Sequence, residues 1–233
     1  MLKTDNVLYH KEKYYSARVR QSYVAELPRG YTGQFGPGVQ ALALVMYFGM
    51  QASEPKIDEF FANVGVEISE GQVSNLLIKK QAEFHQESAE VYDAGLRSSS
   101  WQHTDDTLMR VNGQNQHCHV VCNPVYTAYH TRPTKERLSV LDILRQGRTR
   151  IFRLNEELGA RQRVCKRDVS FGPRTQDGVR AWDTFATLEA TTKKLGISFY
   201  RYIFDRISDA GQIPLLAHLV ENAARELNLG WSF

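Results

Sequence analysis

The sequence has few cysteines and no long apolar run, and these absences narrow what the protein can be. Its three cysteines cannot all pair within one chain, and their scarcity suits a reducing compartment rather than a disulfide scaffold. No run approaches the roughly 18 apolar residues of a membrane span, and the first residues lack the apolar region of a signal peptide. No Gly-rich phosphate loop of the Walker type occurs, which argues against a nucleotide hydrolase. We therefore expect a cytoplasmic protein without membrane partners.

A strong overall charge is also absent, but positive charge gathers in one segment. The 233 residues are 42% hydrophobic and 24% charged, with a net charge of +3, which fits one or two globular domains. Between Arg145 and Arg180, ten basic residues stand against four acidic ones, a local net charge of +6. Such a segment is either a solvated basic face or a surface that neutralises DNA phosphates. The candidate DNA contacts are Arg148, Arg150, Arg161, Arg163, Lys166, Arg167 and Arg174.

The stretch from Trp101 to Leu154 has the pattern of an α/β domain. A first strand is expected to end near Thr104, before an acidic pair, and the next run closes on Asn112-Gly113, a dipeptide that favours a tight hairpin. Two β-branched and aromatic runs, a helical spacing of apolar residues and another extended run follow, over 116–122, 125–131, 138–144 and 150–154. Three antiparallel strands, a crossover helix and a parallel strand form the opening half of a ribonuclease H-like fold. We therefore expect an α/β protein with a partial core of that class.

The residues before this stretch are expected to be helical. Val39–Met50 is nearly continuous in apolar residues and predicts a buried helix, and Ile57–Asn63 predicts a second one. A third helix is expected from its cap, Ser69, to about Ala94. This order is compatible with a helix-turn-helix that contacts DNA, although plain three-helix packing is more common. The residues that would meet DNA in a helix-turn-helix are Gln72, Ser74, Asn75 and Lys79.

The end of the chain also predicts helices, because apolar residues recur there at helical spacing. They are expected over 183–194, 198–208 and 214–227. We expect these helices to be amphipathic, with one face toward a core.

Two long parts of this sequence resemble one family. The run His103-Thr104-Asp105-Asp106-Thr107, with 110–115, 120–129 and 135–144, resembles the opening of the catalytic core in bacterial insertion sequence 66 family transposases. The runs 157–164, 167–175 and 178–213 resemble that family's terminal block. The resemblance implies three parts: a helical lead-in over 1–97, the first half of the catalytic core over 98–156, and a basic, helical C-terminal block over 157–233.

The sequence departs from the family pattern between these two parts. In the family a long segment separates them, and it holds the middle catalytic aspartate and a large helical insertion. Here that segment is absent, and the two parts join near Asn155–Glu157. We therefore expect an internal deletion, which sequencing the locus for an intervening reading frame would test.

The resemblance implies a site for divalent cations. Transposases of this kind transfer phosphoryl groups with three carboxylates that converge on two Mg²⁺ or Mn²⁺ ions about 4 Å apart. Asp105 is implied as the first ligand and Glu157 as the third, while strand alternation turns Asp106 the other way and Thr107 supports the turn. Taken without the resemblance, the acidic pair is a hydrogen-bonded turn and Glu157 a solvent-facing helix residue. Because the second aspartate has no counterpart, we expect little or no transposition activity.

Two other groups of residues are weaker candidates for a metal site or a nucleophilic site. His117, Cys118, His119 and Cys122 hint at a metal site, but on a strand both cysteines take one face and both histidines the other. A buried strand with satisfied side chains is the commoner arrangement. Cys165 lies between basic neighbours, yet no histidine is near it in sequence to form a nucleophilic pair.

Two functions from different classes follow from these features. The first is an internally deleted, inactive transposase whose ancestral reaction is DNA cleavage and strand transfer at transposon ends. The second is a non-catalytic DNA-binding or assembly module that modulates a full-length transposase or joins its oligomer. In both cases the partner is DNA, which would bring the protein to the nucleoid. A third outcome, a relic that does not fold stably, follows if the missing strands expose an apolar sheet edge.

Overall fold

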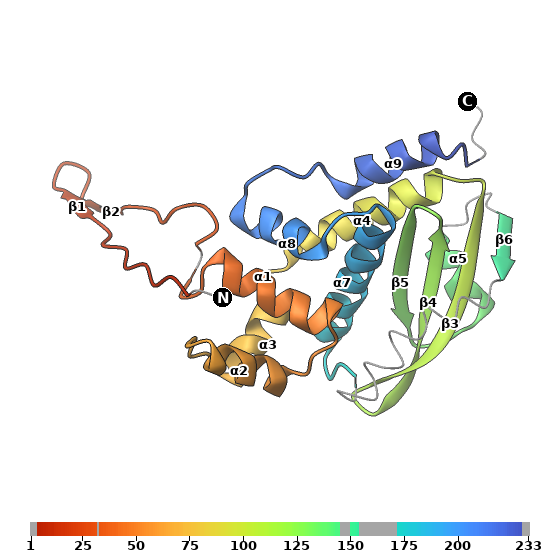
Figure 1. The fold of residues 1–233 in the computed structure, drawn as a ribbon, viewed down its shortest axis with the longest axis horizontal. Coiled ribbons are helices and arrows are strands. Elements are labelled where there is room, and N and C mark those ends of the chain that lie inside the picture. The colour runs from red at the N-terminus through yellow and green to blue at the C-terminus, as the bar shows by residue number, and fades with distance from the viewer. Residues whose placement is uncertain (1–3, 32, 145–149, 154–171, 230–233) are drawn as a thin grey trace.

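The protein is described by a computed structural model that covers residues 4–31, 33–144, 150–153 and 172–229. A four-stranded sheet in the order β5-β4-β3-β6 forms one side of the molecule (Figure 1). β3, β4 and β5 are antiparallel, and β6 pairs with β3 in parallel. The strands span Trp101–Val111 (β3), Gln114–Asn123 (β4), Tyr126–Arg132 (β5) and Arg150–Arg153 (β6). The expected succession of three antiparallel strands, a helix and a parallel strand is present.

β3 is longer than expected, and this changes where the acidic pair lies. The sequence predicts a strand end near Thr104, but β3 continues past it in one unbroken register with β4. In that register Asp105 lies opposite Val120 and Asp106 lies opposite His119. The predicted strand end is wrong because β4 supplies pairing partners along the whole of this segment.

The hairpin between β3 and β4 turns as the sequence predicts. Asn112 and Gly113 have φ angles of 47° and 77°. A two-residue type I′ turn needs positive φ at both positions, which asparagine and glycine adopt at low cost. The N–H of Asn112 also donates to the carbonyl of Pro173 at 3.3 Å, which attaches the turn to the C-terminal part of the chain.

The N-terminal part is helical as expected, with one break that the pattern does not predict. α1 (Pro37–Leu44) continues as the π-helical η1 (Val45–Gly49), and α2, α3 and α4 span Glu54–Asn63, Glu70–Ile78 and Ala82–Arg97. Ser69 caps α3 in a capping box with Gln72, which confirms the predicted cap. The prediction of one helix from Ser69 to about Ala94 is wrong, since Lys80 takes a φ of 61° and separates α3 from α4. Gln81 Nε2 donates to the Leu76 carbonyl 2.6 Å away and so satisfies the end of α3.

The C-terminal helices lie close to their predicted positions. α5, α7, α8 and α9 span Arg137–Ile143, Gln176–Lys194, Phe199–Ser208 and Leu216–Glu226. α7 begins earlier than predicted because Thr175 Oγ1 accepts a hydrogen bond from the Gly178 N–H at 3.0 Å and caps the helix. Ser198 caps α8 in the same way, through the Arg201 N–H at 3.4 Å. Within the described ranges, no helix is long and apolar enough to cross a membrane.

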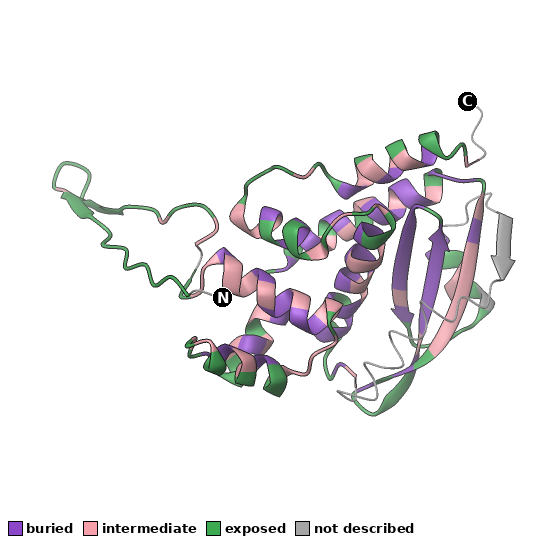
Figure 2. Cartoon of the chain, viewed as in Figure 1, coloured by how far each residue is buried: buried purple, intermediate pink, exposed green. Residues whose placement is uncertain are grey.

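α4 docks on the sheet through a glycine. A Cβ atom at Gly95 would lie 2.5 Å from ring atoms of Tyr126, whose side chain is fully buried. The Gly95 carbonyl accepts hydrogen bonds from Gln102 Nε2 and Asn123 Nδ2, both at 3.3 Å. A residue without a Cβ is what allows the helix and the ring to approach this closely. β4 and β5 are buried over most of their length as a result (Figure 2).

α7 closes the outer edge of the sheet along β5. Alternate residues of β5 donate their N–H groups to side chains of α7, at 3.3, 3.1 and 2.7 Å in the pairs Thr127–Thr191, Tyr129–Thr187 and Thr131–Asp183. The three acceptors are spaced by four helix residues, about 6 Å, and their donors by two strand residues, about 6.8 Å. The two repeats match, so the helix satisfies the edge that would otherwise pair with another chain.

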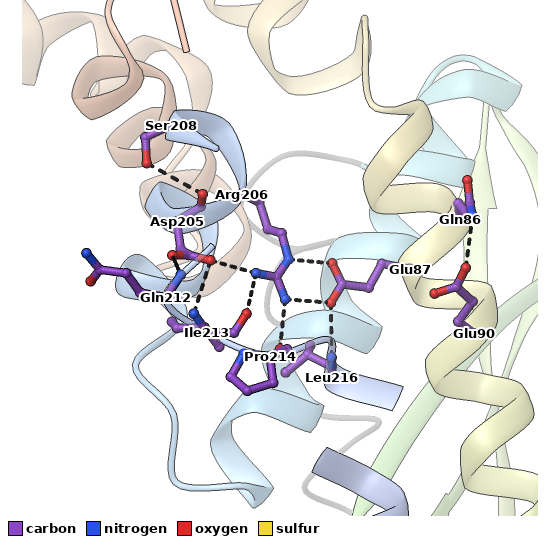
Figure 3. A network of polar contacts seen from close by, with 10 residues as sticks. All are labelled: Gln86, Glu87, Glu90, Asp205, Arg206, Ser208, Gln212, Ile213, Pro214 and Leu216. Carbon is purple, nitrogen blue, oxygen red and sulfur yellow. Dashed lines mark hydrogen bonds and ion pairs between the residues drawn. The ribbon is translucent and has the colours of Figure 1, made fainter. Parts of the chain in front are cut away.

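A buried ion-pair network joins α4 to α8. Arg206 donates to Glu87 through Nε and Nη2, at 2.8 and 3.0 Å, and to Asp205 through Nη1 at 2.7 Å (Figure 3). It also donates to the carbonyls of Ile213 and Pro214, both at 2.9 Å. Burial opposes the charged guanidinium, but the hydrogen bonds and charge of Glu87 raise the pKa of Arg206 above its ordinary value. The network holds the chain between α8 and α9 against α4.

One element stands apart from this body. β1 (Lys13–Ser16) and β2 (Gln21–Val24) pair into a two-stranded ribbon at the end of an arm, which projects away from the helices (Figure 1). Its residues are exposed on both faces, apart from a half-buried Ser16 (Figure 2). The ribbon therefore takes no part in the core that the helices and the main sheet share.

Candidate functional site

β3 carries the two carboxylates of the candidate site on opposite faces of the sheet. Directly opposed residues of antiparallel strands share a face, so Asp105 lies on the face of Val120 and Asp106 on the face of His119. This agrees with the alternation expected from the sequence. The two carboxylates therefore cannot converge on one cation while β3 keeps this register.

Asp105 is a half-buried carboxylate whose partner across the ladder is apolar. Its Oδ1 accepts a hydrogen bond from the N–H of Asp106 at 2.8 Å. Across the ladder it faces Val120, and the next residues on the same face are Thr107 and its partner Cys118. Val120 and Cys118 are both buried. The described neighbours thus leave the second oxygen of Asp105 without a charged partner from β4.

Asp106 lies among histidines instead. Its Oδ2 is 3.9 Å from Nδ1 of His117, an ion pair when the imidazole is protonated. His119, directly opposite Asp106, is within 3.3 Å of the Thr134 carbonyl through Nε2, and His130 follows it on β5. The histidines of β4 share this face, as the sequence predicts, while the buried cysteines of β4 take the other face.

The donor atoms in the described residues do not fit the two-cation site that the family resemblance implies. Across the described part of the chain, no group of three or more His, Cys, Asp or Glu side chains is arranged to hold a metal ion. Asp105 faces Val120 and not a second carboxylate. Glu157, the other implied ligand, lies outside the described residues. A pair of Mg²⁺ ions needs several oxygen ligands around each cation, and one half-buried carboxylate does not supply them.

Most of the basic residues expected to meet DNA also lie outside the described ranges. Arg150 is placed by its backbone in β6, opposite Trp101, and Arg174 is exposed just before the cap of α7. Arg148, Arg161, Arg163, Lys166 and Arg167 are not described, and neither is Cys165. In the helix-turn-helix candidate, Gln72 is engaged in the capping box, and Asn75 and Lys79 are exposed.

A cavity that the sequence does not predict lies between α4, β5 and α7. It has a volume of about 420 Å³, and Asp105 does not line it. His85 on α4 is within 2.7 Å of Thr184 Oγ1 on α7, and burial together with the charge of Arg180 lowers the pKa of this histidine. No sequence spacing indicates this cavity, because its walls come from distant segments. The polar lining residues include His85, Tyr92, His130, Arg132, Asp142 and Arg180.

Comparison with known proteins places part of the chain in a family. The family described as "Transposase IS66 family" matches residues 32–153, which is more than half of the chain. A Sinorhizobium fredii protein named "Uncharacterized protein y4jO" is 37% identical over 90 residues, which cover 38% of this chain and 28% of that protein. The chain thus matches less than a third of that relative's length. No solved structure matches this chain.

Proposed function

Because this chain belongs to the IS66 transposase family, we propose that it acts in DNA transposition as a DNA-binding member that does not cleave DNA by itself. The proposal depends on one observation above all: the residues that follow Arg153, Leu154-Asn155-Glu156, include no aspartate where the family's middle catalytic aspartate would stand. DNA cleavage and strand transfer by two cations need more carboxylate ligands than Asp105 alone. The chain therefore keeps the family's framework without the full cation site.

The arrangement of the main sheet supports the proposal that Asp105 derives from a transposase catalytic site. β6 lies in parallel beside β3, with Thr104 opposite Arg153, so the carboxylate of β3 is one residue beyond the last parallel pair. This is the strand order of the first half of a ribonuclease H-like core, which we propose for this sheet. In such a core the first aspartate and the residue that follows the fourth strand approach each other at the same end.

The place of the proposed deletion supports the loss of cleavage. The family match ends at Arg153, directly before the proposed join near Asn155–Glu157. The middle aspartate would follow the fourth strand, and the sequence has no counterpart for it there. When bound, Mg²⁺ or Mn²⁺ would activate the attacking oxygen and stabilise the leaving one. With Asp105 and Glu157 as the proposed remaining ligands, the cations would depend largely on water.

We propose that the chain still binds DNA although it does not cleave it, because binding needs basic side chains rather than a metal site. Lysine and arginine side chains that neutralise phosphates release counterions, which makes the affinity depend on salt. The segment proposed to do this carries a local net charge of +6 between Arg145 and Arg180. The contacts proposed in it are Arg148, Arg150, Arg161, Arg163, Lys166, Arg167 and Arg174.

Two measurements on the purified chain test this proposal. The first is binding to a labelled transposon-end duplex and to an unrelated duplex, titrated against salt, where we expect salt-dependent binding. The second is nicking of supercoiled plasmid with Mg²⁺ or Mn²⁺, where we expect no cleavage. Cleavage that disappears in Asp105→Ala but persists in a Glu83→Ala control would overturn the proposed inactivity. A cooperative melt by far-ultraviolet circular dichroism would exclude an unfolded relic.

A further inference from the structure

The β1–β2 ribbon has the properties of a contact surface and not of a structural element. Both of its strands are exposed, and Tyr14, Tyr15 and Tyr23 are 68%, 64% and 52% exposed. Tyr14 and Tyr23 lie directly opposite each other on one face of the ribbon. An isolated two-stranded hairpin is marginally stable in water, since neither face buries apolar surface. A partner that covers these rings would stabilise the ribbon.

The base of the arm is attached to the body of the protein. Arg29 Nη1 and Asp209 Oδ2, at the end of α8, form an ion pair of 2.7 Å. A Cβ at Gly30 would lie 3.0 Å from the Ile207 carbonyl, so the backbone of the arm packs closely against the end of α8 at this point. The base of the arm is therefore fixed to the body, and the arm extends outward with the ribbon at its end (Figure 1).

The charges of the ribbon indicate what kind of partner would cover it. From Lys13 to Val24 the chain contains the basic residues Lys13, Arg18 and Arg20 and no acidic residue. Arg18 and Arg20 lie in the turn between the strands, at the outer end of the arm. Two copies of this ribbon would repel each other, because each carries a charge of +3. A polyanion is the complementary partner.

Duplex DNA matches both the charge and the shape of the ribbon. The major groove of B-DNA, about 12 Å wide, admits a two-stranded β-ribbon. Arginines at the turn would neutralise phosphates on the groove walls, and exposed tyrosines supply both apolar surface and hydroxyl donors for the backbone. Exposed aromatic rings with basic residues between them are a common combination on surfaces that bind nucleic acids.

We propose that the β1–β2 ribbon is a DNA-binding arm that contacts duplex phosphates through Lys13, Arg18 and Arg20, with Tyr14 and Tyr23 packed against the DNA backbone. The proposal rests on the proposed function in DNA transposition and assigns a second contact surface to it, remote in sequence from the basic segment near the C-terminal block. Because the ribbon is outside the core, its residues can be changed without loss of the fold.

The test compares the full chain with an Arg18→Gln/Arg20→Gln variant by fluorescence anisotropy on two unrelated duplexes across a salt series. Each phosphate contact contributes about 0.9 to the slope of log affinity against log salt, so the slope should fall by about 1.8 on both duplexes. The matched control is Arg201→Gln/Arg225→Gln, which removes two exposed arginines on α8 and α9 and should leave the slope unchanged.

The outcomes separate this proposal from the proposed function. If the wild-type chain binds DNA and the turn variant binds with the same slope as the control, the arm is not a DNA contact, and the proposed function stands. If the wild-type chain binds no duplex at low salt, both proposals fail. If Tyr14→Ser/Tyr23→Ser lowers the mass in sedimentation without changing DNA affinity, the ribbon is a contact between copies, and the proposal is overturned. A circular dichroism melt identical to wild type verifies that each variant is folded.

Discussion

The main sheet, which is antiparallel over β3, β4 and β5, and the antiparallel β1–β2 ribbon differ completely in their surroundings. The main sheet has α4 on one face and α7 along its edge, and β5 gives its outward N–H groups to Asp183, Thr187 and Thr191. The ribbon has neither, and both of its faces are exposed. Antiparallel pairing thus occurs in both regions, but only the main sheet buries a face and satisfies its outer edge. What stabilises a sheet is the burial of a face and the satisfaction of its edges.

The two regions should also respond differently to substitution. A variant in the main body should change stability, whereas a variant in the ribbon should change only binding. Loss of a contact in the body should appear in the free energy of unfolding. Loss of a side chain in the ribbon should appear in association with DNA. Four variants test this division.

The largest effect is expected at the network that joins α4 to α8. In Glu87→Ala the Arg206 guanidinium, whose side chain is 17% exposed, loses its bidentate partner and keeps its charge. Removing one partner of a buried pair typically costs 3–5 kcal/mol, so we expect a loss of about that size in urea denaturation. The control Glu83→Ala removes an exposed carboxylate from the same helix and should cost less than about 1 kcal/mol. Equal losses would contradict the role of the network.

The next effect is expected where α4 meets the sheet. Gly95→Ala places a methyl group 2.5 Å from the Tyr126 ring, which is fully buried and whose hydroxyl donates to Gln102 Oε1 at 2.9 Å. Overpacking of this kind costs about 1–3 kcal/mol, despite the better helix propensity of alanine. Gly71→Ala on α3 meets no atom within 4 Å and should instead stabilise by up to about 1 kcal/mol. Thermal melts of both variants measure the difference, and the same sign in both would refute this account.

The third effect, comparable in size to that of Gly95→Ala, is expected at the edge of the main sheet. Thr187→Val keeps the shape of the side chain but leaves the buried N–H of Tyr129 without its acceptor. An unsatisfied buried donor costs about 1–3 kcal/mol, which chemical denaturation would detect. Thr192→Val is the matched control, because its hydroxyl donates to the Glu189 carbonyl within the same helix. A control as destabilised as Thr187→Val would mean that the edge contact contributes nothing of its own.

The smallest effect on stability is expected in the ribbon. Tyr14→Ser/Tyr23→Ser removes two exposed rings that contact no part of the core. The free energy of unfolding should change by less than about 0.5 kcal/mol, as for other surface substitutions. A drop comparable to that of Gly95→Ala would show that the ribbon packs on the body and would remove the contrast between the two regions.

The sequence predicts well those features that depend on neighbours along the chain. The Asn112-Gly113 turn, the Ser69 cap and the succession of strands all follow from local backbone preference and side-chain period. The opposite faces of Asp105 and Asp106 follow from the same period. For the candidate site, the role of Asp105 as a cation ligand stays a prediction from the resemblance, and Glu157 and most of the basic residues lie outside the described part of the chain.

Other features depend on contacts between distant segments, and no local pattern indicates them. The extension of β3 through the acidic pair depends on β4, and the need for glycine at Gly95 depends on the Tyr126 ring. The sequence by itself determined the type and order of most elements, the Ser69 cap and the family. The tertiary structure decided which edges are closed and which surface remains open, because burial and hydrogen-bond satisfaction are set only when distant segments meet.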